Sequence, residues 1–171
     1  MSENEVHLTI QLNGVLRTAT VDRRMLLVEA LRDRFGVTGP KVGCGTGDCG
    51  TCTVTVDGAV TKSCLELAVA AEGASVTTLE GLAINRELAP LQQAFWDEYA
   101  FQCGFCLSGM LFSAQDLLSH TPAPTDEEIR LALSGNLCRC TGYDTIVSAV
   151  RRAADGTQDG PGDTARPAAA D

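Results

Sequence analysis

The chain has 171 residues, of which 44% are hydrophobic and 20% are charged, so most of it has the composition of a globular protein. This length is enough for one domain or two small ones and excludes a large catalytic barrel. Thirteen basic residues against 22 acidic ones give a net charge of −9 without any basic run, which argues against a nucleic-acid-binding protein.

Nothing in the sequence indicates a membrane or a secreted protein. No apolar stretch is long enough to cross a bilayer, and the first five residues lack the pattern of a signal peptide. We therefore expect a cytoplasmic protein, in which cysteines stay reduced.

The first eighty residues show the alternation of apolar and polar side chains that is typical of strands. Predicted strands cover residues 6–12, 15–21, 53–56, 60–64 and 76–79. Asn13-Gly14 predicts a tight turn between the first two strands, and Asp22 is a candidate N-cap for a short helix that ends at Phe35-Gly36. A Gly-rich loop over residues 39–52 follows. We expect a small α+β domain with a mixed sheet.

Near Gly81 the period-two pattern gives way to a helical period of 3.6 residues. One face of the first predicted helix is formed by Leu88, Leu91, Phe95 and Tyr99. Further helices are predicted over residues 105–118 and 143–154, and a capping box at Thr125 and Glu128 opens another helix between them. Four short helices of this kind predict a compact bundle.

These patterns divide the chain into four segments. An α+β domain covers residues 1–80, a linker covers 81–86 and a helical domain covers 87–154. Residues 155–171 contain no large apolar side chain, so burial cannot offset the entropy lost on ordering, and we expect a disordered tail.

The most informative feature is a set of eight cysteines. They are Cys44, Cys49, Cys52, Cys64, Cys103, Cys106, Cys138 and Cys140. In a secreted chain an even number of cysteines would indicate disulfides, whereas in a reducing compartment clustered thiols are more typical of metal ligands. Four thiolates are what one tetrahedral zinc ion or one iron–sulfur cluster requires. The eight cysteines divide along the chain into two sets of four, which suits two small domains.

The first set consists of Cys44, Cys49, Cys52 and Cys64, and its spacing is C-x4-C-x2-C-x11-C. This is the plant-type ferredoxin spacing for a [2Fe–2S] cluster. The loop contains Gly43, Gly45, Gly47 and Gly50. Such glycines let a loop wrap closely around an anionic cluster and aim backbone N–H groups at it, and Lys41 would add positive charge nearby. A zinc site is the alternative, although zinc ligands usually come as two close pairs across a longer gap.

The second set consists of Cys103, Cys106, Cys138 and Cys140, with the spacing C-x2-C-x31-C-x-C. Both pairs are predicted to lie at or near helix N-termini, where free N–H groups favour thiolates and an anionic cluster. From the residues alone this set suits either zinc or an iron–sulfur cluster.

Both motifs, in this order, resemble the small iron–sulfur subunit of the molybdenum hydroxylase (xanthine oxidase) family. The resemblance rests on residues 41–52 with Ser63-Cys64, on residues 102–106, and on the run Gly135-Asn136-Leu137-Cys138-Arg139-Cys140-Thr141-Gly142-Tyr143. It covers about residues 5–154. The family usually has Thr-Pro-Gly after the second cysteine of the C-x2-C pair. This chain has Leu107-Ser108-Gly109 there, which removes no ligand; we expect a change in the packing or solvation beside the cluster.

The resemblance implies an α+β fold with a plant-ferredoxin-like β-grasp domain followed by a four-helix bundle, each with one [2Fe–2S] cluster. It implies an electron-transfer subunit with no catalytic residues of its own. Electrons would pass from a molybdopterin site on a large subunit to the C-terminal cluster, then to the N-terminal cluster, and then to FAD on a medium subunit of a heterotrimer. By the same resemblance, Gln102 hydrogen-bonds the pterin across the subunit interface and Cys140 is the ligand nearest to it, while residues 45–48 face the flavin side.

Two other functions stay open from the residues alone, namely a zinc-stapled adaptor and a free-standing two-cluster ferredoxin. The Gly-rich C-x4-C-x2-C loop favours an iron–sulfur cluster over zinc. The bundle domain and Gln102 argue against a free ferredoxin, because a soluble electron shuttle needs no residue facing a pterin.

Overall fold

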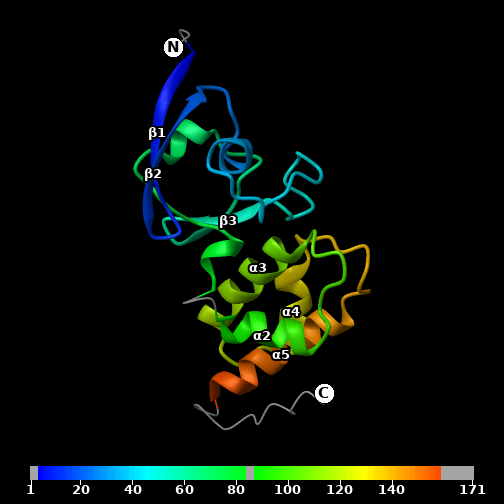
Figure 1. Cartoon of the computed structure of the whole chain (residues 1–171). Helices are drawn as coiled ribbons and strands as arrows, with labels where there is room; N and C mark the ends of the chain where they lie inside the picture. Colours follow the sequence, from blue (N-terminus) through cyan, green and yellow to red (C-terminus); the bar gives the residue numbers. More distant parts are fainter. Residues whose placement is uncertain (1–3, 84–86, 159–171) are drawn as a thin grey trace, which may run out of the picture.

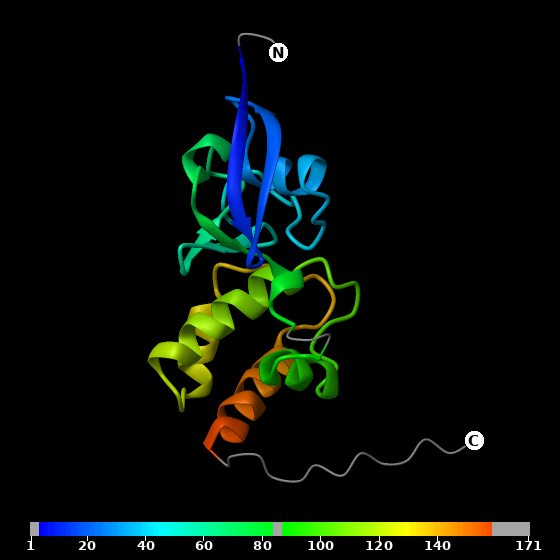
Figure 2. The same ribbon diagram turned by 60° about the vertical axis from the view of Figure 1, so that its left-hand side comes forward.

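The computed structural model describes residues 4–83 and 87–158 (Figure 1). Strands and short helices come first: β1 (Glu5–Leu12), β2 (Val15–Asp22), α1 (Leu27–Glu29), η1 (Ala30–Arg34), β3 (Thr53–Val56), β4 (Ala59–Lys62), η2 (Ala68–Ala71), β5 (Ser75–Thr77) and η3 (Leu79–Gly81). The longer helices follow: α2 (Pro90–Asp97), α3 (Leu107–His120), α4 (Asp126–Leu133) and α5 (Asp144–Gln158). Figures 1 and 2 show the strands gathered in one half of the molecule and α2 to α5 in the other. The expected change of pattern near Gly81 is confirmed.

The sheet is mixed, as the sequence predicts. Within the described residues it has five strands in the order β2-β1-β5-β3-β4. β1 pairs with β2 and β3 with β4 in antiparallel hairpins, whereas β5 pairs parallel to β1. The first hairpin turns at Asn13-Gly14, where both residues have positive φ, as a two-residue turn of this kind requires. Leu8, Ile10 and Leu12 of β1 are buried on one face.

The short helix after β2 is present, but its predicted N-cap is wrong. Asp22 instead accepts hydrogen bonds from the backbone N–H and the guanidinium of Arg24, which closes the turn between β2 and the helix. The helix begins after Leu26, whose backbone N–H donates to the Glu29 carboxylate over 3.0 Å. The first turn is α1, and η1 continues it with the wider hydrogen-bond spacing of a π-helix.

The helical half has a core of its own, lined by all of its longer helices. Its buried members include Phe95, Met110, Leu111, Ile129, Leu133, Ile146 and Val150. Leu79 and Leu82, on either side of the predicted domain boundary, pack against this core, not against the sheet core. The segment around 81–83 therefore belongs in packing terms to the helical half.

The predicted first helix is shorter than expected. α2 begins at Pro90, a residue suited to a first helical turn, and ends at Asp97. Leu88 and Tyr99 therefore lie outside it, and both are exposed, Tyr99 with a positive φ. The apolar face that was expected to include them is formed by Leu91 and Phe95.

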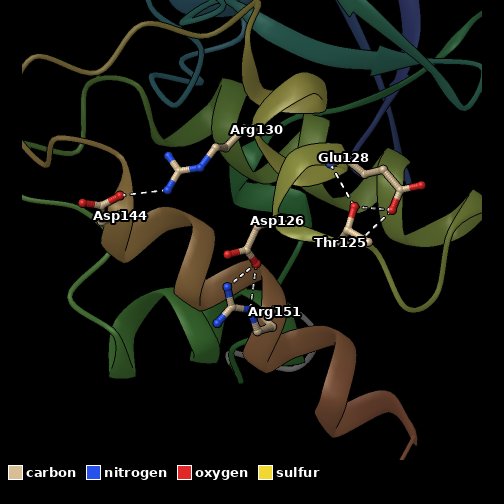
Figure 3. A network of polar contacts seen from close by, with 6 residues as sticks. All are labelled: Thr125, Asp126, Glu128, Arg130, Asp144 and Arg151. Atoms are coloured by element: carbon tan, nitrogen blue, oxygen red, sulfur yellow. Dashed lines mark hydrogen bonds and ion pairs between the residues drawn. The ribbon is translucent and has the colours of Figure 1, made fainter.

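A helix cap closes the N-terminus of α4, and two ion pairs join α4 to α5 (Figure 3). The backbone N–H of Glu128 donates to Thr125 Oγ1, and the Glu128 carboxylate accepts from the backbone N–H of Thr125 over 2.7 Å, so the predicted capping box is confirmed. Asp126 pairs with Arg151 of α5, and Arg130 pairs with Asp144 over 3.0 Å.

The last helix runs further than the sequence predicts. α5 ends at Gln158, four residues beyond the predicted end at residue 154 and inside the expected tail. The rest of that tail, residues 159–171, lies outside the described residues, as do residues 84–86 of the predicted linker. In the parts that the structure describes, no helix combines the length and the apolar character needed to cross a bilayer.

Candidate iron–sulfur centres

The β3–β4 hairpin brings two cysteines of the first set together. Thr53 of β3 pairs with Lys62 of β4, so Cys52 immediately precedes one strand and Cys64 follows the other at the same end of the hairpin. Ser63 reinforces this end by donating its hydroxyl to the Cys52 carbonyl over 2.5 Å. Both thiols are buried and contact Val28 of the short helix. Strand pairing thus brings Cys52 and Cys64 close together, although they are twelve positions apart in the sequence.

The Gly-rich loop supplies the other two cysteines of the first set. The backbone nitrogens of Thr46 and Cys49 both lie 3.4 Å from Cys44 Sγ, so the loop directs N–H donors at this sulfur, as the glycine pattern predicts. At Gly43 a side chain is excluded by close approach, because an added Cβ would lie 2.7 Å from Cys49 Sγ. Gly45, Gly47 and Gly50 have positive φ.

The thiols of the first set differ in exposure and in acidity. Hydrogen bonds from the Thr46 side chain, and then from the backbone N–H groups of Cys49 and Thr46, lower the pKa of the exposed Cys44 to about 6. Burial raises the pKa of Cys52 to about 11. At neutral pH Cys44 is therefore mainly a thiolate, whereas Cys52 is mainly a protonated thiol.

The second set joins two loops of the helical half. Cys103 and Cys106 lie directly before α3, with Cys106 at the N-cap position, and Cys138 and Cys140 lie in the connection between α4 and α5. The Sγ atoms of Cys103 and Cys140 are 3.5 Å apart, although 37 residues separate them. Both pairs precede a helix, so the predicted placement near helix N-termini is confirmed.

The second loop is held by Tyr143. The backbone N–H of Cys138 donates to the Tyr143 hydroxyl over 2.9 Å, and that hydroxyl donates to the carbonyl of Asn136. Burial, and then the neighbouring Cys138 thiol, raises the pKa of Cys106 to about 12. The backbone N–H of Phe105 and then the Cys140 thiol lower the pKa of the exposed Cys103. The second set thus repeats the contrast between a buried and an exposed thiol.

The donor set fits two-iron clusters. All eight cysteines are free, and each set contains buried and exposed members. Among residues 4–83 and 87–158, no three His, Cys, Asp or Glu side chains gather around the position of a single metal ion. Each set supplies the four thiolates that one [2Fe–2S] cluster requires, two for each of its irons.

Gln102 is exposed beside the second set. Its Nε2 donates to the Cys140 carbonyl over 3.2 Å, so the side chain lies next to the cysteine with which the family resemblance associates it. Two cationic side chains of the cysteine loops, Lys41 and Arg139, are placed differently. Lys41 donates to the Gly39 carbonyl and lies 5.9 Å from the centre of the Phe105 ring, whereas Arg139 is exposed between Cys138 and Cys140.

Sequence reasoning missed the contacts that join the two cysteine sets. The backbone N–H of Leu137, the residue before Cys138, donates to the carbonyl of Cys49 over 2.9 Å. Ser108 is buried at the start of α3, and its hydroxyl donates to the carbonyl of Thr53 over 2.7 Å. No periodicity signals such contacts, because each joins residues more than fifty positions apart.

Two protein families match consecutive segments of the chain. Residues 10–79 match the 2Fe-2S iron-sulfur cluster binding domain, and residues 78–151 match the [2Fe-2S] binding domain. The boundary between the two matches coincides with the change from strands to helices.

Relatives of known role cover most of the chain. It is 50% identical over 147 residues to the nicotine 6-hydroxylase small subunit of Paenarthrobacter nicotinovorans, covering 86% of this chain and 88% of that one. It is 44% identical over 152 residues to the nicotinate dehydrogenase small FeS subunit of Eubacterium barkeri, covering 89% and 97% of the two chains.

Solved structures give the same result. A chain of quinoline 2-oxidoreductase from Pseudomonas putida 86 matches with a TM-score of 0.87 and 46% identity, over 92% of this chain and 99% of that chain. The aldehyde oxidoreductase from Desulfovibrio desulfuricans matches with a TM-score of 0.83 and 44% identity, over 90% of this chain but only 17% of the longer chain. In that protein the corresponding unit is one part of a larger polypeptide.

Proposed function

The chain belongs to the small iron–sulfur subunits of the molybdenum hydroxylase family, and from this premise we propose that its two cysteine sets ligate one [2Fe–2S] cluster each. The first cluster is assigned to Cys44, Cys49, Cys52 and Cys64, and the second to Cys103, Cys106, Cys138 and Cys140. The observation that carries the assignment is that each matched [2Fe–2S] domain contains one complete set of four free cysteines. The chain is thus an electron-transfer subunit of an oxidoreductase.

With the clusters bound, the chain relays single electrons between its partners. Its own residues hold and shield the two sites. The buried Cys52, Cys64 and Cys106 form the inner side of each site and keep water away from it. The exposed Cys44 and Cys140 leave the outer side open to a partner. Backbone N–H groups directed at Cys44 Sγ stabilise negative charge on sulfur, which is one of the means by which a protein sets a cluster potential.

We assign the partners by the exposed edges of the two sites. A large molybdopterin-binding subunit is placed against Gln102 and Cys140. A medium FAD-binding subunit is placed against the loop at residues 45–48, which completes a heterotrimer. The exposure of Gln102 and its hydrogen bond to the Cys140 carbonyl support the first placement. The exposure of Cys44 supports the second.

We also propose the domain organisation that the sequence predicts. The sequence assigns residues 1–80 to a ferredoxin-like β-grasp domain, 81–86 to a linker, 87–154 to a four-helix bundle and 155–171 to a tail. We keep this division but extend the bundle to Gln158, where α5 ends. The separate cores of the sheet and of α2 to α5 support the division. A cytoplasmic location is proposed because eight free thiols suit a reducing compartment.

The test is low-temperature EPR of the dithionite-reduced chain, with spins counted per protein. Two distinct S = 1/2 signals and about two spins per chain are expected for two [2Fe–2S] sites. Cys64→Ser and Cys138→Ser should each remove a different signal and leave about one spin, so each variant is the control for the other. Zinc in place of iron, with no EPR signal in freshly prepared protein, would instead establish a zinc-stapled adaptor.

A further inference from the structure

We propose that Asn136 is a positioning residue that locks the loop of the first cysteine set against the loop of the second. Through this lock it fixes the spacing between the two clusters. The inference rests on the proposed function, because it requires a cluster in each set. It assigns a role to a side chain that ligates nothing.

The two loops meet through the backbone. The Leu137 N–H donates to the Cys49 carbonyl over 2.9 Å, so one hydrogen bond separates the main chain of a first-set ligand from the residue before Cys138. Lys62 makes a second bond across the junction, from its Nζ to the Gly135 carbonyl over 2.9 Å. Figures 1 and 2 show that the two halves of the molecule meet in this region.

Asn136 fills the space behind the Leu137 bond. Its side chain is buried, with 2% of the residue exposed. Its Nδ2 donates to Ser113 Oγ of α3 over 2.8 Å, which fixes the orientation of the amide. Its backbone carbonyl accepts from Tyr143, so the residue is held from both sides.

The Asn136 amide oxygen faces two glycines from opposite halves of the molecule. A Cβ added at Gly50 or at Gly109 would collide with Oδ1, and one added at Gly109 would also collide with the Gly50 carbonyl. Because neither position has a side chain, α3 and the Gly-rich loop approach each other closely with the amide between them. This buried oxygen accepts no hydrogen bond from the described residues.

A buried polar atom without a strong donor costs stability, so the amide is not explained by the core alone. An apolar side chain of the same size would avoid that cost, but it would lose the hydrogen bond to Ser113. That bond orients the Asn136 side chain between Gly50 and Gly109, and we call this side chain the wedge. The geometry thus favours a positioning role. The wedge holds the two cysteine loops at one separation, as required when one electron leaves a reduced cluster and enters the oxidised one beside it.

The experiment compares Asn136→Ala and Gly109→Ala with the intact chain. Asn136→Ala removes the wedge, and Gly109→Ala forces the loops apart while leaving every polar group in place. Gly156→Ala is the matched control, because it also replaces a glycine of a helix but its Cβ would meet nothing within 4 Å. The readouts are spins per chain, the magnetic splitting between the two fully reduced clusters, and amide hydrogen exchange of Leu137.

Both junction variants are expected to keep about two spins per chain and to lose much of the splitting, because magnetic coupling falls steeply with distance. Leu137 should exchange about tenfold faster, which corresponds to about 1.4 kcal/mol and to the loss of one hydrogen bond. Gly156→Ala should match the intact chain in all three readouts.

Three results would overturn the inference. Unchanged splitting and exchange with full cluster content would show that the Asn136 wedge fixes no spacing. Loss of a cluster in both junction variants, but not in Gly156→Ala, would make Asn136 a residue of cluster assembly. Fewer than two spins in the intact chain would instead refute the proposed cluster assignment, on which the inference depends.

Discussion

At the scale of single residues, Ser108 shows how one side chain joins the two halves. It follows a cysteine of the second set, at the position where the family resemblance leads one to expect proline. Its buried hydroxyl donates to Thr53, the first residue of β3. A proline has no hydroxyl and could not make this bond. The departure that the sequence showed at this point is therefore an additional link between the halves.

Replacement of Ser108 by alanine is expected to lower the free energy of unfolding by about 1 kcal/mol, the usual net contribution of one buried hydrogen bond. Denaturant unfolding of the intact chain and the variant measures the change. Ser119→Ala on the same helix is the control, because its exposed hydroxyl bonds only within α3. Equal losses in the two variants would contradict the special role of Ser108.

At the scale of elements, α4 depends on its N-terminal cap. The helix has only eight residues, and its first turn holds three acidic side chains that favour the N-terminal dipole. Thr125 and Glu128 exchange hydrogen bonds across that turn (Figure 3). A helix this short is marginal without its cap and its packing.

Thr125→Ala is therefore expected to destabilise the chain by about 1 kcal/mol, as the loss of an N-cap usually does. Circular dichroism during urea unfolding gives the value. Thr125→Ser keeps the hydroxyl and should behave like the intact chain. If serine were as harmful as alanine, the effect would come from the lost methyl group and not from the cap.

The same cap makes a pH-dependent contribution. The backbone N–H of Thr125, followed by its hydroxyl, lowers the pKa of Glu128 below its usual value. The carboxylate therefore stabilises the folded chain above the unfolded pKa, and this contribution is lost as the pH falls through the lower folded pKa.

Glu128→Gln removes this titration but keeps an oxygen that accepts the Thr125 N–H. The intact chain should be the more stable of the two at pH 7, and the difference should shrink below about pH 4. Urea midpoints at several pH values measure it, and loss of iron in acid cancels because both chains hold the same cysteines. A stability difference that grows as the pH falls would contradict the predicted direction of the pH dependence.

At the scale of the whole molecule, five of the eight cysteines lie in two loops with little regular structure: Cys44, Cys49 and Cys52 in one, and Cys138 and Cys140 in the other. The loop between η1 and β3 and the loop between α4 and α5 contain no strand or α-helix, whereas β1 and β2 pair along their full lengths. Their hydrogen bonds join turns, side chains and the facing loop and do not form a continuous strand ladder, so metal ligation is expected to supply much of their order.

Removal of iron by a chelator should therefore speed amide exchange at residues 43–52 and 137–142 far more than in β1 and β2. Hydrogen exchange of the loaded and chelated chains measures this, and the β1–β2 amides serve as the internal control. Uniform acceleration across the chain would mean that the clusters stabilise the fold as a whole and not these loops in particular.

The sequence by itself determined the division into a strand-rich and a helical half, the two sets of four cysteines, the Asn13-Gly14 turn and the capping box at Thr125. All of these depend on residues close together in the chain, on local period and turn chemistry, or on ligand spacing. They therefore follow from composition and order alone.

Only the tertiary structure decided which thiols are buried, where the short helix begins and how the two cysteine loops touch. Asp22 accepts a hydrogen bond from Arg24 instead of capping the short helix. Tyr99 lies beyond the end of α2, with a positive φ, instead of on its apolar face. The hydrogen bond between Leu137 and Cys49 joins two residues that are 88 positions apart in the sequence. Contacts of this range depend on packing between the halves, which local periodicity does not encode.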